Sequence, residues 1–184
     1  MPELEALARS CCPYEIKGGI ESKTGKINIL LQAFVSKPRL ESFSLIADLM
    51  YVSANAGRIA RALHEICLKR GWSGMAETTL QFCKCFELQL WPHQHPLRQF
   101  AGLLSPELLY KMEDRGLWME SLVDMSATDI GAWLRHPAAG GKIRDAIDSF
   151  PSLGLEAHLQ PITRTVLRVQ LLIKSEFRWK DRNH

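Results

Sequence analysis

The segment from Phe43 to Arg70 constrains the fold of this chain more than any other. Its apolar residues recur every three or four positions, as they do along one side of an α-helix: Leu45, Leu49, Val52, Ala56, Ile59, Leu63 and Ile66. Lys69 and Arg70 stand in the last turn, where cations favour the helix dipole, and Gly71 follows as a helix stop. A helix this long needs partners along its length, because most helices in globular domains have only about 11–12 residues. The sequence therefore predicts a helical bundle with a long central helix.

Shorter helical segments flank the long one and complete the predicted bundle, which covers residues 1–101. Apolar spacing predicts helices at 3–9, at 25–37 with a stop at Pro38, and at 74–91. Hydrophobic residues make up 46% of the chain and charged residues 23%, as in a folded domain. The net charge of +3 permits contact with nucleic acid but does not argue for it alone. No apolar run is long enough to cross a bilayer and the N-terminus does not read as a signal peptide, so we expect a nuclear or cytosolic location and no membrane contact.

The stretch GGIESKTGKINILL, residues 18–31, looks at first like a loop that cradles the phosphates of a nucleotide. That pattern needs four residues between its glycines and a hydroxyl after the lysine to hold magnesium. Gly19 and Gly25 enclose five residues instead, and Ile27 follows Lys26. The stretch is better explained as a turn that begins a helix, and we expect no nucleotide hydrolysis and no cofactor in this chain.

A second stretch, CKCFELQLWPHQH, suggests a metal site at first. Cys83 and Cys85 lie in a helical pattern, where residues two apart point about 200° away from each other and cannot hold one ion. We expect buried, reduced cysteines, and His93 and His95 in a proline-flanked loop. The sequence therefore predicts no metal site and no catalytic residue.

Residues 102–152 have the start signals of several short helices. Ser105 and Pro106 open a helix that runs to Arg115, and Ser126 with Asp129 resembles a capping box before the helix DIGAWLR. HPAAGGK, residues 136–142, is then expected as a tight connection to the helix KIRDAIDSF, which makes this region a helix-hairpin-helix candidate. Two tryptophans, at 118 and 133, are expected in the core.

The predicted hairpin has two interpretations. The backbone N–H groups of Gly140, Gly141 and Lys142 would stand at a helix start, where they could cradle a phosphate, and Lys142 and Arg144 would add positive charge. The alternative is a compact structural turn, and the sequence leaves both open.

The C-terminal region, 153–184, changes to β structure. Leu167, Val169, Leu171 and Ile173 alternate with Val166, Arg168 and Gln170, and Pro161 separates this strand from an earlier one. Two strands alone are marginally stable in water, so we expect the chain to end where a larger β domain begins.

Five stretches together resemble a known accessory unit: GKINILLQAFVS, SFSLIADLMYVSANAGRIARALHEICLKRGW, LWPHQHPLRQF, DIGAWLRHPAAGGKI and PITRTVLRV. They are similar to the Sec-sixty-three homology unit of superfamily-two helicases with two tandem cassettes, most like the cointegrator-complex type, with the spliceosomal type as a near relative. The resemblance implies a mainly α fold: a helical bundle, a helix-hairpin-helix domain and the first strands of a fibronectin-type-III-like sandwich. It also implies motor domains upstream that bind ATP and magnesium.

In that family the long helix, matching Ser53–Arg70 here, lines the channel for one nucleic-acid strand. Arg58, Arg61, Glu65 and Lys69 fall within roughly an 80° arc of such a helix, with Asn55 at its margin. The resemblance implies that Arg58 above all holds single-stranded RNA or DNA, and that further partners are the motor domains and other subunits of a cointegrator-like complex. The pattern without the resemblance favours a solvated face with an Arg61–Glu65 pair, and the resemblance favours strand contact, most of all for Arg58. A protein-interaction scaffold is the alternative function.

Overall fold

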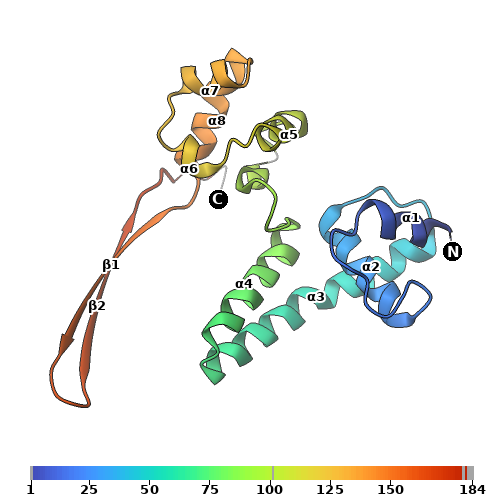
Figure 1. Cartoon of the computed structure of the whole chain (residues 1–184), viewed down its shortest axis with the longest axis horizontal. Helices are drawn as coiled ribbons and strands as arrows, with labels where there is room; N and C mark the ends of the chain where they lie inside the picture. The colour runs from blue at the N-terminus through green and yellow to red at the C-terminus, as the bar shows by residue number, and fades with distance from the viewer. Residues whose placement is uncertain (1, 101, 180, 182–184) are drawn as a thin grey trace. The chain divides into compact units, whose positions relative to one another are not determined.

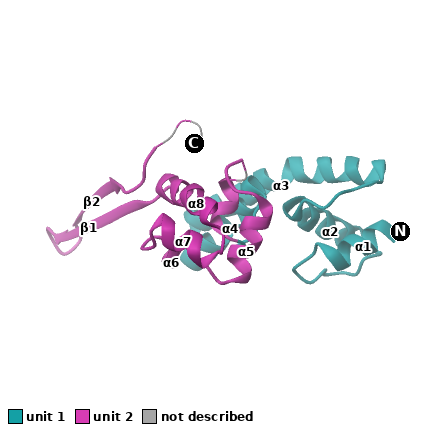
Figure 2. Ribbon diagram, turned by 90° about the horizontal axis from the view of Figure 1, so that it is seen from above, with its two compact units in different colours: residues 1–94 teal, residues 95–184 magenta. Residues whose placement is uncertain are grey.

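A computed structural model describes residues 2–100, 102–179 and 181 of the chain. The chain divides into two compact units, residues 1–94 and 95–184, coloured separately in Figure 2. Both units are largely helical, and a two-stranded antiparallel sheet follows the last helix (Figure 1). The predicted fold class, mainly α with a long helix and C-terminal strands, is confirmed. The three-part division at residues 101 and 152 stays a prediction.

The described residues of the first unit, 2–94, form four helices: α1 (Pro2–Ser10), α2 (Lys23–Ser36), α3 (Phe43–Arg70) and α4 (Ser73–Leu88). The long helix has the bounds that its apolar spacing predicted. Gly71 ends it in a left-handed conformation (φ 69°), and its N–H donates to the carbonyls of Cys67 and Leu68. The chain then reverses, so that α4 runs back along α3 (Figure 1). Gln89, also left-handed (φ 48°), ends α4 three residues before the predicted end at Trp91.

The glycine-rich stretch before α2 forms a turn and a helix start, as predicted. Gly18 and Gly19 have φ angles of 91° and 75°, which favour glycine. Ser22 caps α2 by accepting a hydrogen bond from the Gly25 N–H at 2.9 Å. A side chain at Gly25 would overlap the carbonyl oxygen of Gly19, so this glycine permits a close approach of two backbone segments.

The predicted apolar stripe of α3 is wrong over the part of the helix that packs on α4, because small residues are buried there instead. Leu45, Ala56, Ala60 and Cys67 are buried, whereas Ile59, Leu63 and Ile66 are 59%, 46% and 51% exposed. The buried row therefore lies one position away from the predicted one over the C-terminal half of the helix. Alanines let the two helices approach closely, and His64 Nδ1 lies 3.0 Å from the Ala76 carbonyl of α4, which fixes this side of α3 as the contact.

In the part of the second unit that the structure describes, five helical segments pack around one core: η1 (Pro96–Phe100), α5 (Pro106–Asp114), α6 (Met119–Leu122), α7 (Ala127–Trp133) and α8 (Pro137–Ser149). Ser105 caps α5, and the predicted capping box of Ser126 and Asp129 is present at the start of α7. The core includes Met112, Leu122, Ile130 and Ile143, all fully buried. Trp118 and Trp133, predicted in the core, are instead 37% and 42% exposed.

The connection between α7 and α8 is shorter than predicted. Helix α8 begins at Pro137, so Gly140 and Gly141 lie inside it and not in a turn. The prediction failed because the glycine pair reads as a turn signal, whereas tertiary packing uses one of these glycines in the helix. A side chain at Gly140 would overlap the carbonyl oxygen of Ala127 in α7, so the missing Cβ lets the two helices touch.

The two strands, β1 (Leu153–Pro161) and β2 (Leu167–Ser175), form a hairpin with Leu155 opposite Ile173 and Leu159 opposite Val169. This confirms the predicted alternation and the break after Pro161. Almost every residue of both strands is exposed, so the hairpin's apolar side is uncovered within the part of the chain that the structure describes.

Candidate nucleic-acid interface

Residues of α2, α3 and α4 line a hollow of about 410 Å³ that contains predicted site residues, and we call it the α3 groove. A second hollow of about 360 Å³, lined mainly by α2 and α4, shares Leu31, Phe82 and Phe86 with it. The walls of the α3 groove are Ile27 and Leu31 of α2, Phe82 and Phe86 of α4, and seven residues of α3 between Tyr51 and Ala60. The seven include Asn55 and Arg58, so the structure places both of these predicted site residues in one concave surface.

Arg58 is exposed at this groove and has no ion-pair partner among residues 2–100, 102–179 and 181. Asn55 is half-buried, and its side-chain amide donates to the Tyr51 carbonyl at 2.9 Å, which orients it and leaves its amide oxygen as an acceptor. A free guanidinium offers a fork of N–H donors that matches a phosphate. The site can therefore bind an anion next to an apolar wall.

The other predicted cations of α3, Arg61 and Lys69, do not line the α3 groove. Arg61 pairs with Glu87 of α4, so the alternative pair with Glu65 does not form. Lys69 is exposed in the last turn. It stands eleven residues after Arg58, which returns it to nearly the same side of the helix about 16 Å further along. Glu65 is exposed between them and reduces the positive potential of that side.

The predicted phosphate cradle of the second unit is not formed by its glycines. Because α8 begins at Pro137, the N–H groups of Gly140, Gly141 and Lys142 lie beyond the first helical turn, where the helix uses them in its own hydrogen bonds. Gly140 is also buried against α7. Lys142 is exposed and lines a hollow of about 460 Å³ together with Lys111 and His136. Its ammonium group is therefore accessible to an anion.

Arg144 has a structural role instead. Its guanidinium donates to the carbonyls of Val123 at 3.0 Å and Met125 at 3.2 Å, and to the Asp148 carboxylate at 2.6 Å. The bonds to Val123 and Met125 connect α8 to the segment that follows α6. A phosphate would have to compete with all of these acceptors for the Arg144 guanidinium.

Cys83 and Cys85 are buried, as predicted, and Cys11 and Cys12 are partly buried. Burial raises the pKa of the Cys12 thiol to about 12, with the adjacent Cys11 adding to the effect, so this pair stays protonated. His95 is fully buried: Nδ1 accepts from the Leu97 N–H at 3.2 Å and Nε2 donates to the Leu117 carbonyl at 3.0 Å. Within the described residues no group of three or more His, Cys, Asp or Glu side chains is placed to hold a metal ion.

The whole sequence, residues 1–184, matches the protein family described as the Sec63 Brl domain. The chain belongs to this family. The chain is 50% identical to the DExH-box ATP-dependent RNA helicase DExH14 of Arabidopsis thaliana over 182 residues, which are 99% of the chain. It is 44% identical over 182 residues, again 99% of the chain, to activating signal cointegrator 1 complex subunit 3 of Gallus gallus. It is 42% identical over 172 residues, 94% of the chain, to the U5 small nuclear ribonucleoprotein 200 kDa helicase of Homo sapiens.

The Brl domain spans only 8% of the length of each of these three relatives. The resemblance predicted from the sequence is thereby confirmed at the level of the family. None of the helices that the structure describes combines the length and apolarity needed to span a membrane.

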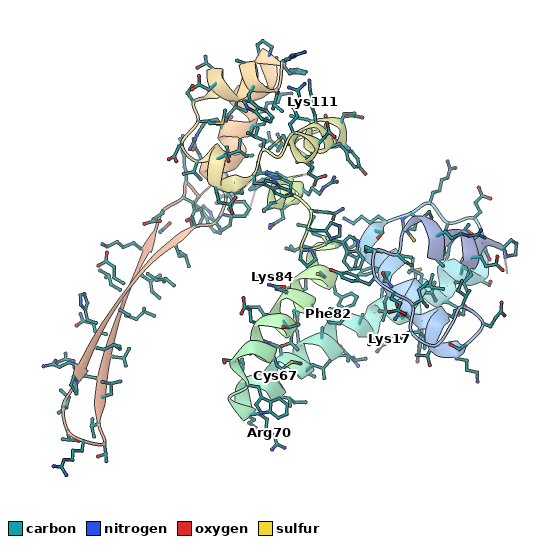
Figure 3. The ribbon with its side chains drawn as sticks, viewed as in Figure 1. Lys17, Cys67, Arg70, Phe82, Lys84 and Lys111 are labelled. Carbon is teal, nitrogen blue, oxygen red and sulfur yellow. The ribbon has the colours of Figure 1, made fainter. Side chains whose placement is uncertain are left out.

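Sequence reasoning missed the aromatic residues at the α3 groove. Tyr51 is 76% exposed and Phe82 is 47% exposed, and both line the groove that contains Asn55 and Arg58. Figure 3 labels Phe82 on α4. The sequence alone does not single them out, because the groove depends on three helices that only the fold brings together.

Proposed function

We propose that this Brl domain is a non-catalytic accessory module of an ATP-dependent helicase and that it grips one strand of RNA or DNA during unwinding. The observation that carries the proposal is the free, exposed Arg58 guanidinium beside Asn55 in the α3 groove. The names of the relatives support the helicase context, since all three are called helicases or belong to a named complex. In this proposal ATP and magnesium bind to motor domains outside the 184 residues, and those domains pull the strand that α3 holds.

The charges of the module fit a weak, sequence-independent grip. Arg58 and Lys69 stand on one side of α3, and a guanidinium or an ammonium group binds a phosphate oxygen without reading the base. Each phosphate neutralised on a single strand contributes about −0.7 to the slope of log affinity against log salt concentration. Two to four such contacts would give binding that is detectable at low salt and lost at high salt.

Fluorescence anisotropy with a 3′-tailed labelled strand tests the proposal on the 184-residue chain. We expect Arg58→Ala to weaken binding about tenfold and to lower the salt slope by about one contact. Arg70→Ala is the matched control, because Arg70 is exposed on the same helix but lies outside the groove. An affinity that both variants leave unchanged, or no binding by the unaltered chain at any ionic strength, would contradict strand gripping.

A second function, a protein-interaction scaffold within a helicase-containing complex, is supported by a different surface. The hairpin presents Leu155, Leu159, Val169, Leu171 and Ile173 on one side, each more than half exposed. Exposed apolar patches of this kind mark interaction sites. If scaffolding is the function, Arg58→Glu will leave strand affinity unchanged, whereas Val169→Asp with Leu171→Asp will abolish capture of subunits of a cointegrator-like complex.

A further inference from the structure

We propose that the α3 groove receives a nucleobase, with the ring of Phe82 as its stacking surface. This inference rests on the proposed strand binding and adds to it the part of the nucleotide that enters the groove. Phosphate contacts alone would need only the cations of α3, Arg58 and Lys69. The apolar interior of the groove is left unexplained by them.

The ring of Phe82 packs against a buried neighbour and is also partly exposed to solvent. It packs edge-to-face on Phe86, with 4.8 Å between ring centroids and 84° between planes. Phe86 is 7% exposed and stacks on Phe34 with 6.4 Å between centroids, so it is a fixed support. Phe82 nevertheless stays 47% exposed. A fixed aromatic ring with an open surface is what base stacking requires, because every base has a π-face.

The rest of the groove combines an apolar surface with polar groups, and a nucleotide combines an apolar base with an anionic phosphate in the same way. Ile27 and Ile59 are 46% and 59% exposed and extend the apolar surface around Phe82. Asn55 and Arg58 supply an amide and a guanidinium at the same groove. A base has flat apolar faces joined through a sugar to an anionic phosphate. It can therefore cover the apolar surface while its phosphate reaches Arg58.

The size of the groove also fits. Its volume of about 410 Å³ lies within the range of ~300–1,000 Å³ that is usual for small-ligand clefts. The competing occupant is an apolar side chain of a partner protein. The free cation and the amide favour the nucleotide, because an apolar side chain would leave both unused.

The test compares two strands of equal length and charge, one with bases and one in which every site is abasic. We expect Phe82→Leu to weaken binding of the base-containing strand at least about fivefold, the effect of losing roughly 1 kcal/mol of stacking. Phe82→Trp keeps an aromatic ring and should retain the affinity. Phe43→Leu is the matched control, because Phe43 is 85% exposed on α3 and lies outside the groove. The abasic strand should bind more weakly than the other and be insensitive to Phe82→Leu.

The outcomes separate this inference from strand gripping itself. Equal affinity for both strands, with Phe82→Leu neutral and Arg58→Ala still harmful, overturns base stacking and leaves strand gripping intact. Weaker binding of both strands by Arg58→Ala, together with weaker binding of the base-containing strand alone by Phe82→Leu, supports both. No strand binding by the unaltered chain overturns both. If a partner protein then protects the amides around Phe82 from hydrogen exchange, the groove belongs to that partner.

Discussion

Helix α8 and helix α3 use their surfaces in opposite ways. Six of the 13 residues of α8 are buried, whereas α3 buries four of its 28. The polar groups of α8 are also committed within the chain, as Arg144 illustrates with its hydrogen bonds to Val123, Met125 and Asp148. The α3 groove keeps an unpaired Arg58 and exposed apolar residues. The contacts of α8 are largely made inside its unit, as in a scaffold, whereas α3 leaves apolar and charged surface exposed.

The largest expected effect tests whether α8 is as tightly fitted as this comparison requires. Gly140→Ala would place a methyl group on the backbone of α7, which cannot move aside as a side chain could. We expect the free energy of unfolding of the second unit to fall by about 3 kcal/mol. Native-state hydrogen exchange of the α8 amides measures this locally.

Gly141→Ala is the matched control, since a Cβ there meets open space. Alanine is the better helix former, so this variant should stabilise the second unit by about 0.5–1 kcal/mol. If both variants stabilise, the contact between α7 and α8 is looser than described and the contrast with α3 disappears.

A smaller effect is the loss of stability of the second unit as the pH falls, which His95 in the core beside α5 should cause. Burial lowers the pKa of His95, and this outweighs the opposite influence of Glu113 and of the Leu117 carbonyl. The unfolded chain therefore binds more protons than the folded one below pH ~6.5, and stability is lost as the pH falls through this value. The loss by pH 5 is at most about 2 kcal/mol, from ~1.4 kcal/mol per pH unit.

The exchange of α8 amides at pH 7 and pH 5 measures this loss. His95→Gln should flatten the pH dependence, and His93→Gln should not, because His93 is exposed. A pH dependence that His95→Gln leaves unchanged would show that His95 does not titrate as its burial requires.

The smallest expected effect is on the exposed apolar row of α3. Leu63→Ala and Ile66→Ala remove side chains that are half exposed, so each should change the free energy of unfolding by no more than about 0.5–1 kcal/mol. Ala60→Leu is the contrasting variant, since Ala60 is 1% exposed between α3 and α4, and overpacking there should cost about 1–3 kcal/mol. Urea unfolding measures both. A large loss for Leu63→Ala would restore the stripe that the sequence predicted.

Sequence patterns predicted the elements that local chemistry determines. The bounds of α3 follow from its apolar run and Gly71, and the start of α7 follows from the reciprocal bonds of Ser126 and Asp129. The side of α3 that is buried could not be predicted, because a spacing of three and four fits the row through Ile59 and Leu63 as well as the row through Ala60. Packing against α4 decides between them.

The candidate site was predicted only in part, for the same reason. Arg58 and Asn55 were identified on α3, and their role stays a prediction. Phe82 was not identified, because the groove combines side chains from α2, α3 and α4 that are far apart in the sequence. Gly140 and Arg144 were predicted at a phosphate cradle, and the packing of α7 and α6 against α8 uses them instead.

The most direct test of the central claim is a two-dimensional ¹H–¹⁵N NMR titration of the 184-residue chain with a short single strand at low salt. Binding by the α3 groove predicts shifts that cluster at Tyr51–Ala60, near Ile27 and around Phe82, with α8 unchanged. Shifts confined to Lys111, His136 and Lys142 in the second unit, or none at saturating strand, would contradict it.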